Sequence, residues 1–255
     1  MIINDTKLIA ANIETFVDIP NGVARLKASI LNLAVSGKLV PQDPKEETAE
    51  QLYKYIQQER IKKDNKVKKL FPITETEIPF KIPKTWKWAR LGDLGFISTG
   101  KTPSTKDEKN YGGDIPFIGP GNILNGRVVA HSKLITPKGL SASTKAFPGD
   151  VVMVCIGGTI GKTAYIEKPV AFNQQINKIT GIGMFSRYLY YAMLSAYFQE
   201  LILSKASGAA TPIVNASKWA SNLIPLPPFA EQKRIVAKVE ELMQLTRKLK
   251  VVLSN

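Results

Sequence analysis

Residues 230–253, AEQKRIVAKVEELMQLTRKLKVVL, form the longest stretch of the chain with a clear helical period. Apolar side chains recur every three or four residues, at Ile235, Val239, Leu242, Leu245, Leu249 and Leu253. This spacing is typical of a long helix whose apolar stripe packs on another helix. Thr246 interrupts a strict heptad, which favours an intimate pair of helices over an extended coiled coil.

The N-terminal part of the chain predicts another helix. In RLKASILNLAVSGKLV, Leu26, Ile30 and Leu33 are spaced by four and then three residues, as on one face of an amphipathic helix. Gly37 tolerates the left-handed backbone conformation that commonly ends a helix. We therefore expect a helix that ends near Ser36.

A further helix is predicted after the turn PQDP. Thr48 with Gln51 three residues later matches a capping box, and Leu52 and Ile56 follow at helical spacing. We expect this helix to end at about Lys63. Its basic end could contact phosphate or could be a solvated helix face, and the sequence leaves both interpretations open.

The middle of the chain changes character near residue 71, where FPITETEIPFKIPKTWKW is rich in proline and has no helical period. Short β-type runs follow, including DIPFIG, RVVAHSKLI, DVVMVCI and TAYIEKPVAF, with one expected helix from about Ser186 to Lys205. We predict an α+β fold: a β-rich globular domain flanked by long helices that pack as an antiparallel pair or coiled coil. The expected domains are residues 1–70, 71–226 and 227–255.

Composition indicates a basic protein with little metal or thiol chemistry. Among 255 residues, 35 Lys and Arg outweigh 21 Asp and Glu, which gives a formal charge of +14 and favours polyanionic partners. The chain has one cysteine, Cys155, in an apolar run where a buried thiol is expected, and one histidine, His131, expected at the surface. With one of each, His/Cys zinc sites and Ser–His or Cys–His nucleophilic centres cannot be built repeatedly, so metal and acyl-transfer enzymes are disfavoured.

No membrane or secretory segment is expected. The apolar stretches are far shorter than the roughly 20 residues that a spanning helix needs. The N-terminus, MIINDTKLIAANIETF, lacks the basic start, apolar run and cleavage site of a signal peptide. We expect a cytoplasmic protein.

Five separated segments, in order, resemble the specificity subunits of type I restriction-modification enzymes. They are LKASILNLAVSGKLVPQDPKEETAEQL, IPKTWKWARLGDLG, STGKTPSTKDEKNYGGDIPFIGPGNI, PGDVVMVCIGGTIGKTAYIEKPVAFNQQINKI and IPLPPFAEQKRIVAKVEELM. The first and last resemble the conserved helical regions of that family, and the others resemble a target-recognition domain. Full-length members have two recognition domains and two helical regions, whereas this sequence has one recognition domain with helices on both sides.

The resemblance implies a non-catalytic subunit that binds half of a bipartite duplex DNA target. It further implies docking to DNA methyltransferase (M) subunits and, through them, to the restriction (R) subunit. S-adenosylmethionine, ATP and Mg²⁺ would then belong to those partners, and no cofactor or metal is expected in this subunit. We also expect a homodimer of half-subunits, because a two-fold interface is self-complementary. A truncated regulatory subunit that occupies the methyltransferase without specificity of its own is the alternative.

DNA reading requires basic groups for phosphates and amide or hydroxyl groups for base edges. The segment STGKTPSTKDEK is a loop rich in small residues, where main-chain N–H groups can approach a phosphate. Residue chemistry alone favours an ordinary solvated loop, and the resemblance favours DNA contact. The candidates here are Thr99, Lys101, Thr102, Ser104, Thr105, Lys106 and Lys109.

The segment GGTIGKT, residues 157–163, is close to a phosphate-binding P-loop, G-x-x-x-x-G-K-[ST]. The residue five before Gly161 is Ile156 instead of glycine, and the following TAYIEKP favours a strand where a P-loop requires a helix. A nucleotide-binding enzyme is thus the less favoured alternative. We expect a tight turn between two strands with Thr159 and Lys162 at its tip, suited to a backbone phosphate.

Two more segments offer polar side chains. Asn173, Gln174 and Gln175 form the densest amide cluster, and such amides either pair bidentately with adenine or brace turns. The segment SKASGAATPIVNASK, residues 204–218, is the preferred base-reading or groove-lining loop, with a plain linker as the alternative. Its candidates are Lys205, Ser207, Thr211, Asn215 and Lys218.

The remaining predictions concern packing. Trp86, Trp88 and Trp219 are expected in the core or at a domain junction, and the acids Asp107, Glu108, Asp114 and Asp150 form no nuclease-like set, so no catalytic residue is predicted. The expected helix–helix or partner interface consists of Leu26, Ile30, Leu33, Leu52, Ile56, Ile235, Val239, Leu242, Leu245 and Leu249.

Overall fold

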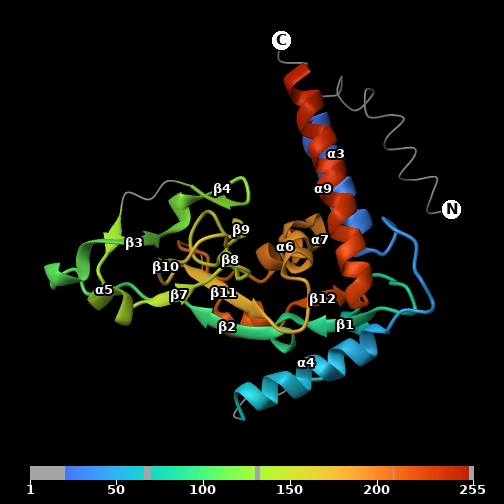
Figure 1. Ribbon diagram of the computed structural model, residues 1–255, viewed down its shortest axis with the longest axis horizontal. Coiled ribbons are helices and arrows are strands. Elements are labelled where there is room, and N and C mark those ends of the chain that lie inside the picture. Colours follow the sequence, from blue (N-terminus) through green and yellow to red (C-terminus); the bar gives the residue numbers. More distant parts are fainter. Residues whose placement is uncertain (1–20, 66–69, 130–132, 209, 253–255) are drawn as a thin grey trace.

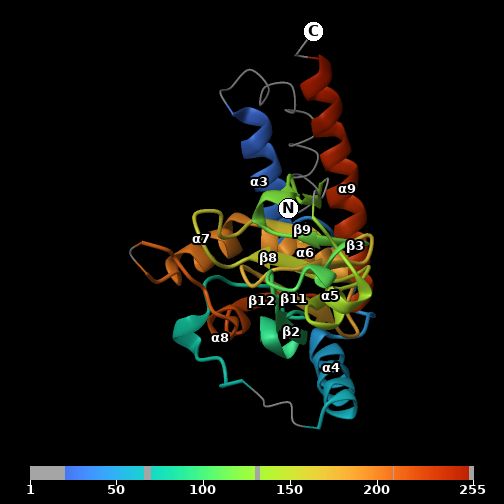
Figure 2. The same cartoon turned by 90° about the vertical axis from the view of Figure 1, so that its left-hand side faces the viewer.

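The computed structural model describes residues 21–65, 70–129, 133–208 and 210–252, with the last five as backbone only. It has the expected α+β fold: small sheets and short helices form one body, from which two long helices project (Figures 1 and 2). His131 lies outside the described residues. The expected strand RVVAHSKLI is observed only at its two ends, as β5 (Arg127–Val128) and β6 (Leu134–Ile135).

The two projecting helices are α3 (Gly22–Val35) and α9 (Phe229–Val252), and they pack against each other. Just after α3, the Gln42 amide donates a hydrogen bond of 3.1 Å to the Glu231 carboxylate in the first turn of α9. The end of α3 therefore meets the start of α9, and the helices run antiparallel (Figure 1). This confirms the predicted antiparallel helical pair.

The helix α4 (Ala49–Lys63) lies on the opposite side of the body from the α3–α9 pair (Figure 1). Its predicted capping box is present: the Thr48 side chain accepts from the Gln51 N–H, and the Gln51 side chain accepts from the Thr48 N–H at 2.8 Å. Leu52 and Ile56 are buried, so α4 packs on the body through the face that its apolar spacing defines.

The first and last strands of the β-rich body pair with each other. Strand β1 (Lys87–Arg90) runs antiparallel to β12 (Leu223–Leu226), so the chain enters and leaves the body at adjacent points. One four-stranded sheet has the order β2 (Gly95–Thr99), β11 (Ile176–Gly181), β8 (Val151–Val154), β9 (Thr163–Tyr165). The other has the order β6, β3 (Tyr111–Ile118), β10 (Val170–Phe172), β7 (Thr144–Ala146). This strand pairing explains how helices far apart in sequence come together.

Short elements complete the body. They are the hairpin strand β4 (Ile123–Leu124), which pairs with β5, the helices α5 (Pro137–Ser141) and α8 (Ala216–Ala220), and the 3₁₀ turns η1 (Glu75–Glu77), η2 (Leu91–Asp93), η3 (Glu108–Asn110) and η4 (Pro120–Asn122).

The helix expected over residues 186–205 is two helices, α6 (Ser186–Leu194) and α7 (Ala196–Ser204). The break falls at Ser195, whose backbone is extended and whose hydroxyl accepts a hydrogen bond from the Phe198 N–H. Serine favours such a capping position because its side chain satisfies an N–H group that the helix leaves free. The apolar spacing continues across the break, so periodicity alone does not reveal it.

One continuous core connects the helical pair with the β-rich body. It includes apolar residues of α3, α4, β1, β8, α6 and α9, together with Trp86 and Trp219. The three tryptophans are buried, as expected. Because the core crosses the predicted boundaries at residues 70 and 226, the helices and the body support each other's folding.

Candidate nucleic-acid interface

Four of the predicted segments meet at one edge of the body. Main-chain hydrogen bonds join Lys101 to Phe172 at 3.1 Å and Cys155 to Gln175 at 2.7 Å, and the Gly157 N–H donates to the Pro212 carbonyl at 2.9 Å. We call residues 99–102, 156–162, 173–175, 205–208 and 210–213 the loop edge. These bonds place the STGK segment, the GGTIGK turn, the NQQ turn and the start of the 204–218 segment beside one another.

The GGTIGKT segment is a tight turn between β8 and β9, which pair antiparallel. The Val154 N–H donates to the Lys162 carbonyl at 2.8 Å, and Gly157 and Gly161 have φ values of 96° and 94°, which glycine adopts without strain. Residues 163–165 form a strand where a P-loop continues into a helix. The geometry thus confirms the predicted turn and contradicts the nucleotide-binding alternative.

Gln199 of α7 braces this turn, a role that no sequence pattern indicated. Its side-chain amide donates to the Gly161 carbonyl at 3.1 Å and to the Met193 carbonyl at 2.7 Å. Thr159 and Lys162 remain exposed at the tip. The turn is therefore held from behind while its tip faces solvent.

Part of the NQQ cluster, residues 173–175, also forms hydrogen bonds that hold its turn in place. The Gln175 N–H donates to Asn173 Oδ1 at 3.1 Å, and the Thr102 hydroxyl donates to Gln174 Oε1 at 2.6 Å. The main chain of Asn173 continues the sheet contacts, since its N–H donates to the Ile118 carbonyl at 3.0 Å. Asn173 thus fixes the turn, and Gln174 lies exposed next to Thr102.

Several candidates in the 204–218 segment form contacts within the chain. Asn215 caps α8 by accepting from the Lys218 N–H at 2.8 Å. Lys218 Nζ donates to the Ser207 hydroxyl at 2.9 Å, and burial, assisted by Arg90, lowers the pKa of Lys205. Thr211 is exposed. Among the described contacts of these candidates, the Thr211 side chain has no hydrogen-bond partner, whereas those of Ser207, Asn215 and Lys218 do.

The STGK candidates divide into two groups. Lys101 and Thr102 lie at the loop edge, while the Thr99 hydroxyl is engaged with Asn177 Oδ1 at 2.8 Å. Ser104, Thr105, Lys106 and Lys109 belong to the chain that leads into η3 and α5, where the Thr136 hydroxyl donates to the Lys109 carbonyl at 2.7 Å. The segment therefore runs from the loop edge to η3, with the Lys101 carbonyl accepting from the Ser143 hydroxyl at 2.7 Å, and its contact with DNA stays a prediction.

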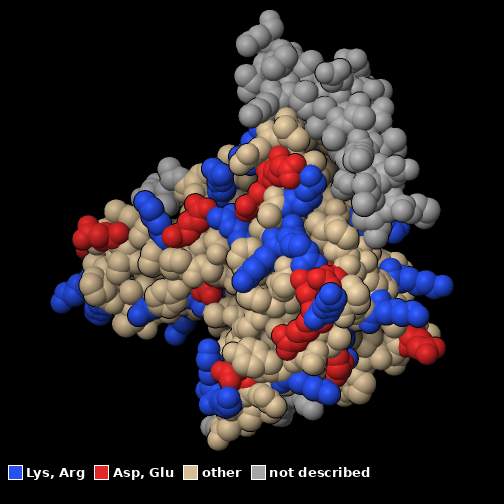
Figure 3. Space-filling model, turned by 45° about the vertical axis from the view of Figure 1, so that its right-hand side comes forward, with Lys and Arg blue, Asp and Glu red and all other residues tan. Residues whose placement is uncertain are grey.

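Basic groups are spread over the surface. On the face in Figure 3, lysine and arginine side chains are interspersed with carboxylates and do not gather into one patch. At the loop edge, Lys101 and Lys162 are exposed and have no ion-pair partner among the described residues. These two lysines are free to meet an anionic partner.

Most side chains of the predicted apolar interface are buried by contacts within the chain. Leu26, Ile30, Leu52, Ile56, Ile235, Val239 and Leu242 are all buried. Leu33 is partly buried, Leu245 is 38% exposed, and the side chain of Leu249 lies outside the described residues. Within the chain α3 and α9 pack on each other, and Leu52 and Ile56 anchor α4 to the core, so these residues form helix contacts of the expected kind. That they also meet another chain stays a prediction.

Sequence reasoning also missed a set of polar contacts, several of them buried, that join the helices and the entry segment 71–90 to the body. We call residues Gln42, Arg60, Glu77, Trp86, Arg90, Asp93 and Glu231 the junction. Arg60 Nη1 lies 3.2 Å from Asp93 Oδ1, with both side chains under 8% exposed. Arg90 donates to Glu77 at 2.9 Å and to three main-chain carbonyls. The Trp86 indole donates to Glu231 at 2.9 Å.

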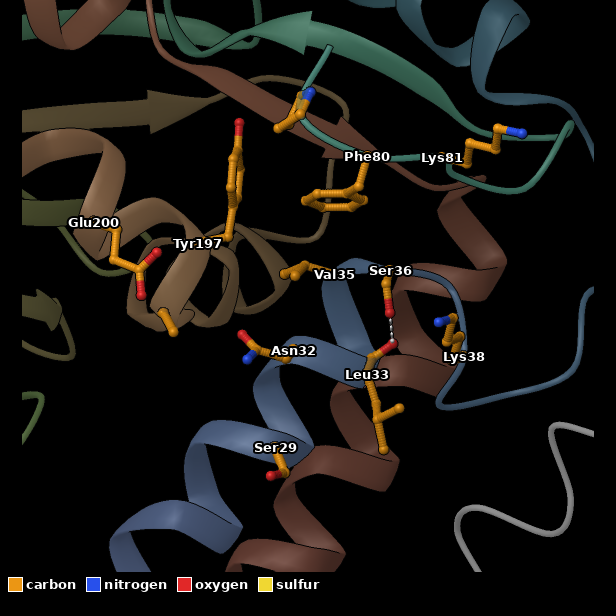
Figure 4. A pocket seen from close by; sticks show the side chains of 12 residues that line it. Ser29, Asn32, Leu33, Val35, Ser36, Lys38, Phe80, Lys81, Tyr197 and Glu200 are labelled. Carbon is orange, nitrogen blue, oxygen red and sulfur yellow. Dashed lines mark hydrogen bonds between the residues drawn. The ribbon is translucent and has the colours of Figure 1, made fainter. Parts of the chain in front are cut away.

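One cavity is lined by no residue of the loop edge. It has a volume of about 880 Å³ and opens between α3, the segment 79–81 and α7. Figure 4 shows Asn32, Phe80, Tyr197 and Glu200 around it. Its walls mix helical polar side chains with two aromatic rings, which does not correspond to any of the predicted DNA-contacting segments.

The described part of the chain shows no reactive thiol, cluster of metal ligands or membrane-spanning helix. Cys155 is buried, which raises the pKa of its thiol to about 12, as expected for a structural cysteine. No group of three or more metal-ligating side chains occurs among the described residues. None of the helices described is long and apolar enough to cross a membrane.

Comparison with known proteins identifies the relatives of this arrangement. Residues 83–255 match the family described as type I restriction modification DNA specificity domain. The EcoAI specificity subunit of Escherichia coli is 30% identical over 97% of this chain and 44% of its own length, and the MjaIX specificity subunit of Methanocaldococcus jannaschii is 33% identical over 63% and 38%. The chain thus spans less than half the length of these relatives.

Solved structures agree on the fold. The crystal structure of the HsdS subunit from Thermoanaerobacter tengcongensis superposes with a TM-score of 0.55 at 20% identity, covering 96% of this chain and 52% of that one. A structure from a study of complex assembly in a type I R-M system gives 0.58 at 20% identity, covering 98% and 53%. With the match over residues 83–255, these findings show that the chain belongs to the family of type I restriction-modification DNA specificity domains.

Proposed function

We propose that this chain is the DNA-reading subunit of a type I restriction-modification enzyme and itself catalyses no reaction. The observation that carries the proposal is the family match over residues 83–255, which includes every segment of the loop edge. The exposed lysines and amides of that edge supply the donors that DNA phosphates and base edges accept. One recognition domain would read one half of a bipartite target, with residues 1–70 and 227–255 as the flanking helical regions.

Sequencing of methylated sites in cells that carry this chain with its methyltransferase tests the proposal. The expected result is one defined split motif, methylated only when the chain is present. DNA affinity of the complex should also fall steeply with salt, because each neutralised phosphate releases counterions with a slope of about −0.9 in log K against log salt. A flat salt dependence and an unchanged methylation pattern would contradict it.

The partners follow from the same proposal. Methyltransferase subunits would dock on the helices and carry S-adenosylmethionine, and the restriction subunit would join through them with ATP and Mg²⁺. Such an assembly would act in the cytoplasm. A truncated regulatory subunit that occupies the methyltransferase without specificity of its own remains the second candidate. Co-purification with the methyltransferase without any change in methylated sites would favour that candidate.

Two copies would pair to rebuild a two-domain subunit. Leu245, which is exposed on α9, supports pairing because it could pack on a second copy. Ile235, Val239 and Leu242 do not support pairing, because they are buried within the chain. Light scattering at tens of micromolar should give the mass of a dimer. A monomer in that measurement, with the methyltransferase absent, would exclude self-pairing and leave DNA reading untouched.

A further inference from the structure

The amide of Gln175 has a fixed orientation. The Gln175 main-chain N–H donates to Asn173 Oδ1 at 3.1 Å, which identifies that atom as the acceptor, because a main-chain N–H can only donate. The other atom of the Asn173 amide is therefore the nitrogen, and it donates to Gln175 Oε1 at 3.0 Å. The acceptor of Gln175 is thus occupied, and its NH₂ group is the end left over.

This orientation excludes one expected role. Bidentate pairing of glutamine with adenine uses the oxygen to accept and the nitrogen to donate. Gln175 already uses its oxygen inside the turn, and its Nε2 has no acceptor among the described residues. Gln175 can therefore offer hydrogen-bond donors only.

The surroundings of this NH₂ group are also donors. Gln175 Nε2 lies 3.6 Å from where a Cβ atom would stand on Gly157. The next two N–H groups along the turn, those of Gly158 and Thr159, donate to no described acceptor. A Cβ on Gly158 would meet nothing within 4 Å, so this side of the turn is open, and the exposed Lys162 adds positive charge.

A site made only of donors suits a phosphate, which only accepts, better than a base edge, which mixes donors and acceptors. We propose that Gln175 and the N–H groups of Gly158 and Thr159 together hold one backbone phosphate of bound duplex DNA. This inference rests on the proposed function and assigns the site to positioning the duplex instead of reading its sequence.

The test measures binding of the full chain, with its methyltransferase, to a pool of random-sequence duplexes and to duplexes selected from that pool. Gln175→Met removes the donors, and binding to both should weaken roughly ten-fold, because a hydrogen bond to a charged group is lost. Base preferences and the salt slope should stay as in the wild type, since no charge changes. Thr76→Val, which removes an exposed hydroxyl outside both the α-helices and the loop edge, is the control and should bind like the wild type.

Gln175→Glu keeps an oxygen for the Asn173 donor but replaces the free NH₂ with a charged oxygen. It preserves the turn, so it decides the question if Gln175→Met fails to fold, and it should bind more weakly than Gln175→Met. Unchanged affinity in a folded variant, or a changed base preference at one position, would overturn the inference while DNA reading stands. Absence of DNA binding by the wild-type complex would instead overturn the proposed function, and the inference with it.

Discussion

The junction and the loop edge use similar polar side chains in opposite ways. At the junction, Arg60, Arg90 and Glu231 are buried, and partners within the chain engage Arg60 Nη1, the Arg90 guanidinium and the Glu231 carboxylate. At the loop edge, Lys101 and Lys162 are exposed and lack ion-pair partners among the described residues. Burying a charge is costly unless it is paired, so the junction holds the fold together, whereas the loop edge keeps its groups for a partner.

This difference separates stability from binding. A change at the junction should act on the free energy of unfolding, because it leaves a buried group without its partner. A change at the loop edge should act on DNA affinity with little effect on unfolding. Variants that mix the two effects would break the comparison.

The largest expected effect is that of Asp93→Ala. Arg60 would remain buried without its carboxylate, and losing one partner of a buried pair costs about 3–5 kcal/mol in the free energy of unfolding. Tyr53 also loses the Asp93 carboxylate as its acceptor, while Gln57 keeps its bond to the Asp93 main-chain carbonyl, so α4 should loosen from the body first. Denaturant unfolding and hydrogen exchange of residues 49–63 measure both consequences.

Glu59→Ala provides the contrast on the same helix. Glu59 pairs with Lys62, whose side chain is 70% exposed, and surface pairs contribute about 0–1 kcal/mol. If Glu59→Ala and Asp93→Ala destabilised the protein equally, the junction would have no special role.

The junction also marks the limit of prediction from sequence. Local features were predictable: the periodic helices α3 and α9, the capping box of Thr48, and the GGTIGKT turn depend on residues close together in the chain. The contact of Trp86 with Glu231 joins residues 145 positions apart, and no spacing pattern in the sequence predicts it. The apolar stripe of α9 was predicted correctly, but the sequence did not identify α3 as the helix that packs on it.

The candidate site shows the same limit at finer scale. Asn215 was a reasonable base-reading candidate because its amide suits adenine, but the same chemistry suits a helix cap, which is the role it has. Asn173 likewise braces its turn. Residue type defines what a side chain can bind, and only the position of its neighbours determines which option is used.

A smaller effect is expected from Glu231→Gln. The Glu231 carboxylate accepts from both Trp86 and Gln42, and an amide has one oxygen to offer, so one donor loses its partner at a cost of about 1 kcal/mol. Thermal unfolding at neutral pH measures this cost. Glu241→Gln, on an exposed part of the same helix, should leave unfolding unchanged.

The pH dependence of the same pair of variants sharpens the result. Burial raises the pKa of Glu231, so the folded state takes up a proton at higher pH than the unfolded chain does. The wild type should therefore lose stability from this residue as pH rises from the ordinary carboxyl value through the raised pKa. Glu231→Gln should lack that loss. A parallel pH profile in both proteins would show that Glu231 is not desolvated as the structure has it.

The smallest effect on stability, within about 0.5 kcal/mol, is expected from Lys162→Met, because an exposed lysine without a partner contributes little to folding. Its effect should appear in DNA binding instead, where losing one phosphate contact flattens the salt slope by about 0.9. Gln175→Met should weaken binding without that change in slope, so the two variants distinguish charge from hydrogen bonding at one turn. Lys162→Met could instead lower the unfolding free energy as much as Glu231→Gln does. The turn would then stabilise the fold as the junction does, and the proposed separation between residues that stabilise the fold and residues that contact DNA would be wrong.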